Sequence, residues 1–230
     1  MNNKIRQLII RFNNEIAFSE VPLLRGAVLN AMGDDVALLF HNHMEDGFRY
    51  AYPLIQYKRI NKKAAIVCVG DGVDTIAQLF SDASFDIKLG DRPLLLEIER
   101  INPIRPMIQV WDTTFKYRLR NWLALNSDNY IRYSEIEEYS ERILFLEKVL
   151  IGNLLSFAKG LGITLDKEIL CKILSINEPR LCIVKGIKMM SFDVDFKTNV
   201  SIPNFVGLGK HVSIGYGTVV RIVENNNKNE

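Results

Sequence analysis

Two histidines that stand two residues apart, His41 and His43, are the side chains of this 230-residue chain best suited to acid–base chemistry. Imidazole titrates near neutral pH, so it can take up a proton and return it during a reaction. In FHNHMEDGF the pair would point the same way on a strand or line one loop. A solvated or capping role fits the same residues. A structural zinc is disfavoured, because it needs four ligands and no cysteine lies near the pair.

The segment YPLIQYKRINKK places Tyr57 beside four positive charges with no acid among them, which are Lys58, Arg59, Lys62 and Lys63. An aromatic ring next to cations can stack on a base while the cations contact phosphate. An ordinary solvated turn between two strands explains the same residues.

The segment FKYRLRNW alternates basic and apolar residues. In a strand Lys116, Arg118 and Arg120 share one face, and the aromatic and leucine side chains between them share the other. Residues 180–221 add six basic residues against Asp193 and Asp195, although the whole chain carries only +2. The positive charge is therefore concentrated locally. The two aspartates, also on one strand face, fit either magnesium binding or an ordinary solvated sheet surface.

The segment GLGKHVSIGYG, residues 207–217, holds four glycines in eleven residues. Glycines let a backbone approach a phosphate chain closely, and lysine, histidine and serine side chains add hydrogen-bond donors. Val212 stands where a Rossmann fingerprint needs its third glycine, and no G-K-[ST] is present, so nucleotide cofactors are disfavoured. A hairpin that needs glycine for turns and bulges is the alternative. The phosphate-binding candidates here are Gly207, Gly209, Lys210, His211, Ser213, Gly215 and Gly217.

The composition is that of a folded protein, with 48% hydrophobic and 24% charged residues. The three cysteines, Cys68, Cys171 and Cys182, form no C-x-x-C pair, which favours a reduced, cytoplasmic protein. No apolar run approaches the roughly 20 residues that span a bilayer, and the first residues carry charges where a signal peptide is apolar. We therefore expect no membrane partner.

The elements that must position these residues fall into two similar halves. In residues 1–102 the hydrophobic pattern predicts a strand, a helix, strands at 36–40, 48–60 and 65–69, a helix after Gly72 and strands within 85–101. This order predicts a ferredoxin-like domain, in which two helices cover one face of an antiparallel sheet and the other face stays open to a ligand.

Residues 102–106, with two prolines, are the predicted linker, and a second domain covers 107–225. There we expect one long helix from about Tyr133, begun by a capping box at Ser134–Glu137 and ended at Gly160. Strands at 169–176, 181–190, 192–197 and 218–223 follow, and 226–230 form a frayed tail. The predicted class is α+β, with tandem ferredoxin-like (RRM-like) domains of order β-α-β-β-α-β.

These features together resemble a known family. The glycine-rich segment near the end of two ferredoxin-like halves is similar to that of the CRISPR-associated repeat RNA endoribonucleases of the RAMP superfamily. The stretches YRLRNWLALNSDNY, LEKVLIGNLLSFAKGLGI and FKTNVSIPNFVGLGKHVSIGYG look like the subgroup with this C-terminal domain. The resemblance spans most of the chain, and the glycine segment is specific to the superfamily rather than to RNA cutting.

The resemblance implies a metal-independent, cofactor-free endoribonuclease that processes CRISPR repeat RNA for antiviral defence. A ribose 2′-hydroxyl attacks the adjacent phosphate, leaving a 2′,3′-cyclic phosphate and a 5′-hydroxyl. A catalytic histidine between the first helix and the second strand is common in the family, which points to His41 and His43; Tyr50, Tyr57 and Lys58 are candidate helpers. The glycine-rich segment would hold the RNA backbone.

Three interpretations stay open at this stage. The favoured one is the repeat RNA endoribonuclease. A non-cutting RNA-binding subunit of a CRISPR interference complex shares the glycine segment. An unrelated enzyme would use His41, His43 and His211 around a metal. The family contains monomers and dimers, so a homodimer and effector-complex protein partners are open as well.

Overall fold

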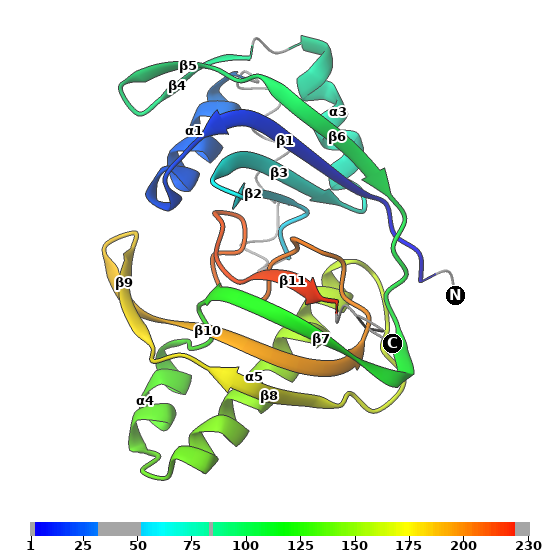
Figure 1. Cartoon of the computed structure of the whole chain (residues 1–230), viewed down its shortest axis with the longest axis vertical. Helices are drawn as coiled ribbons and strands as arrows, with labels where there is room; N and C mark the ends of the chain where they lie inside the picture. Colours follow the sequence, from blue (N-terminus) through cyan, green and yellow to red (C-terminus); the bar gives the residue numbers. More distant parts are fainter. Residues whose placement is uncertain (1–2, 32–51, 83–84, 224–230) are drawn as a thin grey trace, which may run out of the picture. The chain divides into compact units, whose positions relative to one another are not determined.

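The computed structural model of the chain describes residues 3–31, 52–82 and 85–223 (Figure 1). His41, His43, the predicted strand at 36–40 and the tail at 226–230 lie outside the described residues. Two compact units divide the chain. The N-terminal unit is Met1–Met107 with Lys159–Ile163 and His211–Gly215, and the C-terminal unit is Ile108–Ala158, Thr164–Lys210 and Tyr216–Glu230.

The N-terminal unit is built on a four-stranded antiparallel sheet in the order β2-β3-β1-β6. Its elements are β1 (Gln7–Glu15), a 3-10 turn η1 (Phe18–Glu20), α1 (Val21–Ala31), β2 (Ile55–Ile60), β3 (Lys63–Val69), α3 (Gly72–Asp82), β4 (Asp86–Leu89), β5 (Arg92–Leu95) and β6 (Ile98–Ile104). Strands β4 and β5 form a separate hairpin between α3 and β6. Without this hairpin, the order is the β-α-β-β-α-β predicted from the sequence.

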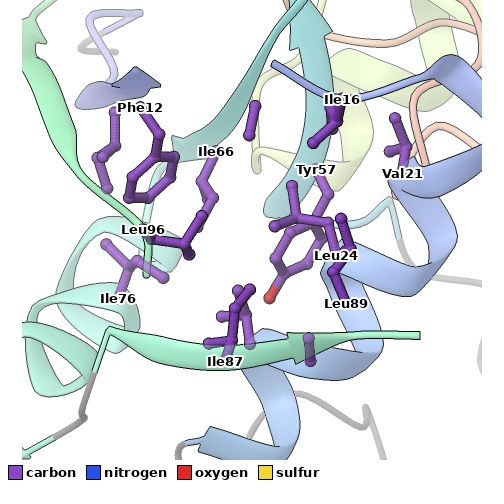
Figure 2. Packing of buried hydrophobic residues seen from close by; sticks show 14 of the residues in the cluster. Phe12, Ile16, Val21, Leu24, Tyr57, Ile66, Ile76, Ile87, Leu89 and Leu96 are labelled. Carbon is purple, nitrogen blue, oxygen red and sulfur yellow. The ribbon is translucent and has the colours of Figure 1, made fainter. Parts of the chain in front are cut away.

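The core of this unit lies between the sheet and the two helices. Period-2 alternation turns Ile10 and Phe12 of β1 and Ile66 of β3 to the side where Leu24 of α1 and Ile76 of α3 pack, and all five are fully buried. Figure 2 shows Phe12 near Ile66 and Leu96, and the ring of Tyr57 beside Leu24.

Ala65 and Val67, which alternate with the core residues of β3, have no exposed surface either. The predicted linker is wrong in part, because β6 extends to Ile104 and pairs Pro103 with Leu8 of β1. Strand β6 is at the sheet edge, where the missing backbone N–H of Pro103 is tolerated.

The C-terminal unit repeats the same strand arrangement in the order β11-β7-β10-β8, with β9 paired to β10. In Figure 1 α5 runs behind this sheet. The elements are β7 (Val110–Trp122), α4 (Ser127–Glu135), α5 (Tyr139–Gly160), β8 (Cys171–Ile176), β9 (Arg180–Val184), β10 (Ile187–Val200) and β11 (Thr218–Ile222). Residues 201–217, which include the glycine-rich segment, stand where the pattern places a second helix. The α+β class with two ferredoxin-like halves is confirmed.

In the C-terminal unit the helix and the hairpin differ from the predicted elements. The long helix is split into α4 and α5, and Ser134 donates to the Tyr130 carbonyl inside α4 (2.8 Å) instead of capping a new helix. Asn126 is the cap of α4, because its side chain accepts the Asn129 N–H (2.7 Å). The predicted strand at 181–190 is a hairpin whose turn residues, Lys185 and Gly186, have φ of 49° and 80°.

No helix within the described ranges combines the length and apolar composition needed to cross a membrane.

Helix α5 is joined to strand β8 by Glu147, a buried side chain on the core-facing side of the helix. Its carboxylate accepts the backbone N–H of Ile173 (2.9 Å) and the ammonium of Lys172 (3.1 Å). We expect Glu147→Ala to lower the free energy of unfolding by about 1–3 kcal/mol, because a backbone donor loses its acceptor. Urea unfolding measures the change. Glu147→Gln, which keeps an acceptor for Ile173, should cost less.

The control for this change is Glu137→Ala, an exposed glutamate between the two helices. It should alter the free energy of unfolding by no more than about 0.5 kcal/mol. Equal losses for the two alanine variants would contradict the structural part given to Glu147.

Candidate functional site

The ends of the glycine-rich segment are fastened to the end of strand β7. Gly217 N–H donates to the Asn121 carbonyl (2.9 Å), and Lys210 N–H donates to the Leu123 carbonyl (3.2 Å). Asn121 itself is left-handed, with φ of 49°. Its N–H donates to the carboxylate of Asp193 (2.7 Å) on the neighbouring strand β10. A β-bulge at this point therefore anchors the segment.

Steric contacts within the C-terminal unit explain Gly209 and Gly217. Gly209 has φ of +93°, and a Cβ there would lie 2.8 Å from the indole of Trp122 and 2.9 Å from the Leu123 carbonyl oxygen. Gly217 has φ of +61°, and a Cβ there would collide with the Leu208 carbonyl. Side chains rarely adopt such backbone angles. The glycine-dense turn weighed from the sequence accounts for these two positions without an RNA contact.

The middle of the segment, His211–Gly215, belongs to the N-terminal unit. The Tyr57 N–H donates to the Ser213 carbonyl (2.9 Å), and Tyr57 forms a parallel bridge with Ile214. Strand β2 is at the edge of its sheet, so this bridge covers an otherwise open row of backbone groups. Gly215, with φ of +97°, packs against the ring of Phe18, where a Cβ would lie at 3.2 Å.

Lys58 and Tyr57 are both buried in β2. The Lys58 ammonium donates to the Val212 carbonyl (3.1 Å), and burial lowers the pKa of this lysine to about 7. The Tyr57 ring lies in the core, its hydroxyl meets no partner among the described residues, and burial raises its pKa (Figure 2). Neither side chain reaches solvent, as the predicted solvated turn or direct RNA contact would require. Lys58 instead tethers the glycine-rich segment, and Tyr57 packs in the core.

The basic face predicted on 115–122 is present in β7. Lys116 and Arg118 are exposed, and Tyr117 and Leu119 between them are buried. Arg118 forms a two-pronged ion pair with Asp195, with both N–O distances at 2.8 Å.

Three lysines on adjacent strands form a row across the same sheet. Lys197 of β10 pairs in register with Lys116 of β7 on one side and with Lys172 of β8 on the other. Like charges directly opposite each other are unfavourable for folding. The Lys172 ammonium meets the Glu147 carboxylate (3.1 Å), so the charge of this row is balanced in part within the protein.

Asp193 and Asp195 are in ion pairs with arginines. Asp195 holds Arg118, and Asp193 lies 2.8 Å from Arg180 and 3.5 Å from Arg120. Within the part of the chain that the structure describes, no three His, Cys, Asp or Glu side chains are grouped as a metal site. Ion pairing is thus the observed role of both aspartates, which the sequence left between magnesium binding and a solvated surface.

The structure adds Asn121, which the sequence did not point to, and gives specific partners to Arg180, one of the six basic residues of 180–221. Asn121 sits at the bulge, and Arg180 donates to its side-chain oxygen (3.2 Å). Asparagine's tolerance of the left-handed region was the one local signal for the bulge. His211 also has positive φ, 55°, and its side chain is half-buried. His41 and His43, the predicted catalytic pair, lie outside the described residues.

Comparison with known proteins assigns both halves of the chain. Residues 1–105 match the Cas6b N-terminal domain, and residues 109–222 match the Cas6b C-terminal domain. The chain belongs to the Cas6b family. The resemblance to CRISPR-associated repeat RNA endoribonucleases stated from the sequence is thereby confirmed.

Solved structures agree with this assignment to the Cas6b family. A crystal structure of Cas6b superimposes with a TM-score of 0.84 at 27% identity, covering 95% of this chain and all of the other. A second, of the CRISPR RNA processing endoribonuclease Cas6b, gives 0.74 at 26% identity with the same coverage. An uncharacterized protein of Methanocaldococcus jannaschii is 38% identical over 116 residues, which are 50% of this chain and 78% of that protein.

We expect Gly209→Ala to lower the free energy of unfolding by at least about 2 kcal/mol, because it combines a disfavoured φ with a Cβ pressed against Trp122 and a carbonyl. Gly162→Ala is the matched control, since Gly162 also has positive φ (+70°) but nothing lies within 4 Å of its Cβ position. Thermal and urea unfolding measure both variants. Equal destabilisation would mean that backbone strain alone, and not the close approach, requires glycine at 209.

The depressed pKa of Lys58 predicts a pH dependence of stability. Between about pH 7 and the ordinary lysine value near 10.5, the unfolded chain binds a proton at Lys58 that the folded chain has lost. Stability contributed by this site therefore rises with pH over that window, with a slope of at most about 1.4 kcal/mol per pH unit. Buried Cys68, whose pKa is raised by burial, acts in the opposite direction above about pH 9.

The difference between the wild type and Lys58→Met isolates the lysine, because the thiol is common to both proteins. Urea unfolding from pH 6.5 to 9 should show the wild type gaining stability relative to the variant as pH rises. Parallel curves over this range would contradict a lysine that titrates near neutrality.

Proposed function

We propose that this chain is an endoribonuclease that cleaves CRISPR repeat RNA during guide RNA maturation. The observation that carries the proposal is the match of both halves to the two Cas6b domains, together with the likeness over 95% of the chain to a structure described as a CRISPR RNA processing endoribonuclease. The exposed basic residues on β7 and β10 suit an RNA substrate, because phosphate neutralisation dominates affinity for nucleic acids.

The proposed reaction needs a base, an acid and no metal. One of His41 and His43 removes the proton of a ribose 2′-hydroxyl, and that oxygen then attacks the adjacent phosphorus. The bond from phosphorus to the 5′ oxygen breaks, and the other histidine or Tyr50 protonates this leaving oxygen. The products are a 2′,3′-cyclic phosphate and a 5′-hydroxyl, so all atoms and protons of the substrate are retained.

The support for catalysis differs from residue to residue. Lys58 is buried against the Val212 carbonyl, so its contribution is to hold the glycine-rich segment in place rather than to neutralise the reacting phosphate. Lys210, His211 and Ser213 keep partly exposed side chains and are the donors that we propose for the RNA backbone. Lys116 is exposed on the C-terminal sheet and is a further donor that we propose for the RNA, whereas Arg118 is paired with Asp195.

Replacing both His41 and His43 with alanine should lower the cleavage rate by on the order of 10² to 10⁴ and leave repeat RNA binding largely intact, because acid–base groups act on the reaction rather than on affinity. Single-turnover cleavage of end-labelled repeat RNA in EDTA measures the rate, and mapping of the product ends tests the chemistry. Asn42→Ala, between the two histidines, is the matched control and should cleave near the wild-type rate.

Unchanged cleavage by the double variant would refute the histidine assignment. Tight RNA binding by the wild type without any cleavage would favour the non-cutting subunit. Activity that disappears in EDTA and returns with a divalent ion would replace the proposed mechanism by a metal-dependent one.

A further inference from the structure

The β-bulge below the glycine-rich segment places two arginines around one carboxylate. Strand β10 contributes Asp193 opposite both Arg120 and Asn121 of β7, because the register shifts between Leu119 and Trp122. Asp193 Oδ2 lies 2.8 Å from an Nη of Arg180 and 3.5 Å from an Nη of Arg120.

The charges of this arginine cluster, defined as Arg120, Arg180 and Asp193, do not cancel. Two guanidinium groups face one carboxylate, which leaves a net charge of +1. The carboxylate is 12% exposed, whereas the side chains of Arg120 and Arg180 are 43% and 62% exposed. Each guanidinium carries five N–H donors in a planar fork, so donors remain available beyond those that meet Asp193.

The neighbouring pair on the same sheet shows the contrast. Arg118 and Asp195 are matched one to one, and both oxygens of the carboxylate meet nitrogens of a single guanidinium at 2.8 Å. That pair is neutral and geometrically complete. The arginine cluster is therefore distinguished by an excess of positive charge rather than by the mere presence of arginine.

Hydrogen bonds hold the arginine cluster at the base of the glycine-rich segment. Asp193 Oδ1 accepts the Asn121 N–H (2.7 Å), and Arg180 also donates to the side-chain oxygen of Asn121 (3.2 Å). The carbonyl of the same asparagine accepts the N–H of Gly217 (2.9 Å). Groups positioned in advance bind a ligand at a smaller cost in conformational entropy.

We propose that Arg120 and Arg180 bind one phosphate of the RNA backbone at the base of the glycine-rich segment, and that Asp193 limits their charge. A planar fork from each side suits the oxygens of a phosphodiester. This site deepens the proposed function and rests on it, since it takes RNA as the ligand. Asp193 acts only through its charge on the two arginines and does not contact the RNA.

The test asks whether removing the negative charge of Asp193 raises or lowers the affinity for RNA. In Asp193→Asn the amide oxygen can still accept the Asn121 N–H, while the negative charge is removed. We expect the full-length variant to bind RNA roughly two- to fivefold more tightly at low salt and to show a steeper dependence of affinity on salt concentration. The probe is repeat RNA with 2′-O-methyl groups throughout, which binds but has no 2′-hydroxyl to attack with.

Two further variants complete the measurement. Arg180→Ala should weaken binding and flatten the salt dependence by roughly 0.7 in the slope of log K against log salt, the value for one phosphate of a single strand. Asp74→Asn is the charge-matched control, because it removes the carboxylate of an exposed two-pronged pair with Arg6 in the N-terminal unit. It should leave both affinity and slope near the wild-type values.

Weaker or unchanged RNA binding by folded Asp193→Asn would overturn the proposal, as would an equal gain in Asp74→Asn. If Asp193→Asn does not fold, Arg120→Ala and Arg180→Ala decide, and unchanged salt slopes in both overturn it. Cleavage of unmodified repeat RNA by the wild type is measured separately. If the wild type binds repeat RNA but does not cleave it, the proposed function is wrong. The binding results then still test the phosphate site on their own.

Discussion

The backbone of the glycine-rich segment is the constraint on which the surrounding structure depends. Its ends are hydrogen-bonded to carbonyls at the end of β7, and its middle bridges the edge of β2. Gly209, Gly215 and Gly217 have positive φ, and at each of them a side chain would press on the protein itself. The same motif that suggests phosphate binding is thus required for packing, so its glycines alone do not demonstrate an RNA contact.

The basic residues near this segment are found in two different environments. Lys58 is dehydrated beneath the Val212 carbonyl and loses most of its preference for the charged form. On the exposed sheet of the C-terminal unit, by contrast, Arg118 is neutralised by Asp195 while Arg120 and Arg180 share Asp193. Strand register thus leaves Arg120 and Arg180 with one carboxylate between them, whereas the lysine that follows Tyr57 in the sequence is buried.

Membership in the Cas6b family and the local geometry support different statements. The family match covers both domains and supports the general activity. The contacts of the described residues explain how the glycine-rich segment is held and which basic groups stay exposed. Backbone hydrogen bonds fix the glycine-rich segment, and its side chains Lys210, His211 and Ser213 are therefore held in defined positions.

Several features follow from the sequence by itself. Period-2 alternation in FKYRLRNW and the order of apolar segments identify strands, helices and the tandem ferredoxin-like class, because burial of one face is encoded residue by residue. Other features were decided only by tertiary structure. The break between α4 and α5, the burial of Lys58 and the sharing of Asp193 by two arginines depend on which strands become neighbours and in what register. Such contacts join residues far apart in the chain, as in Lys58 and Val212, which are 154 positions apart, and no local pattern specifies them.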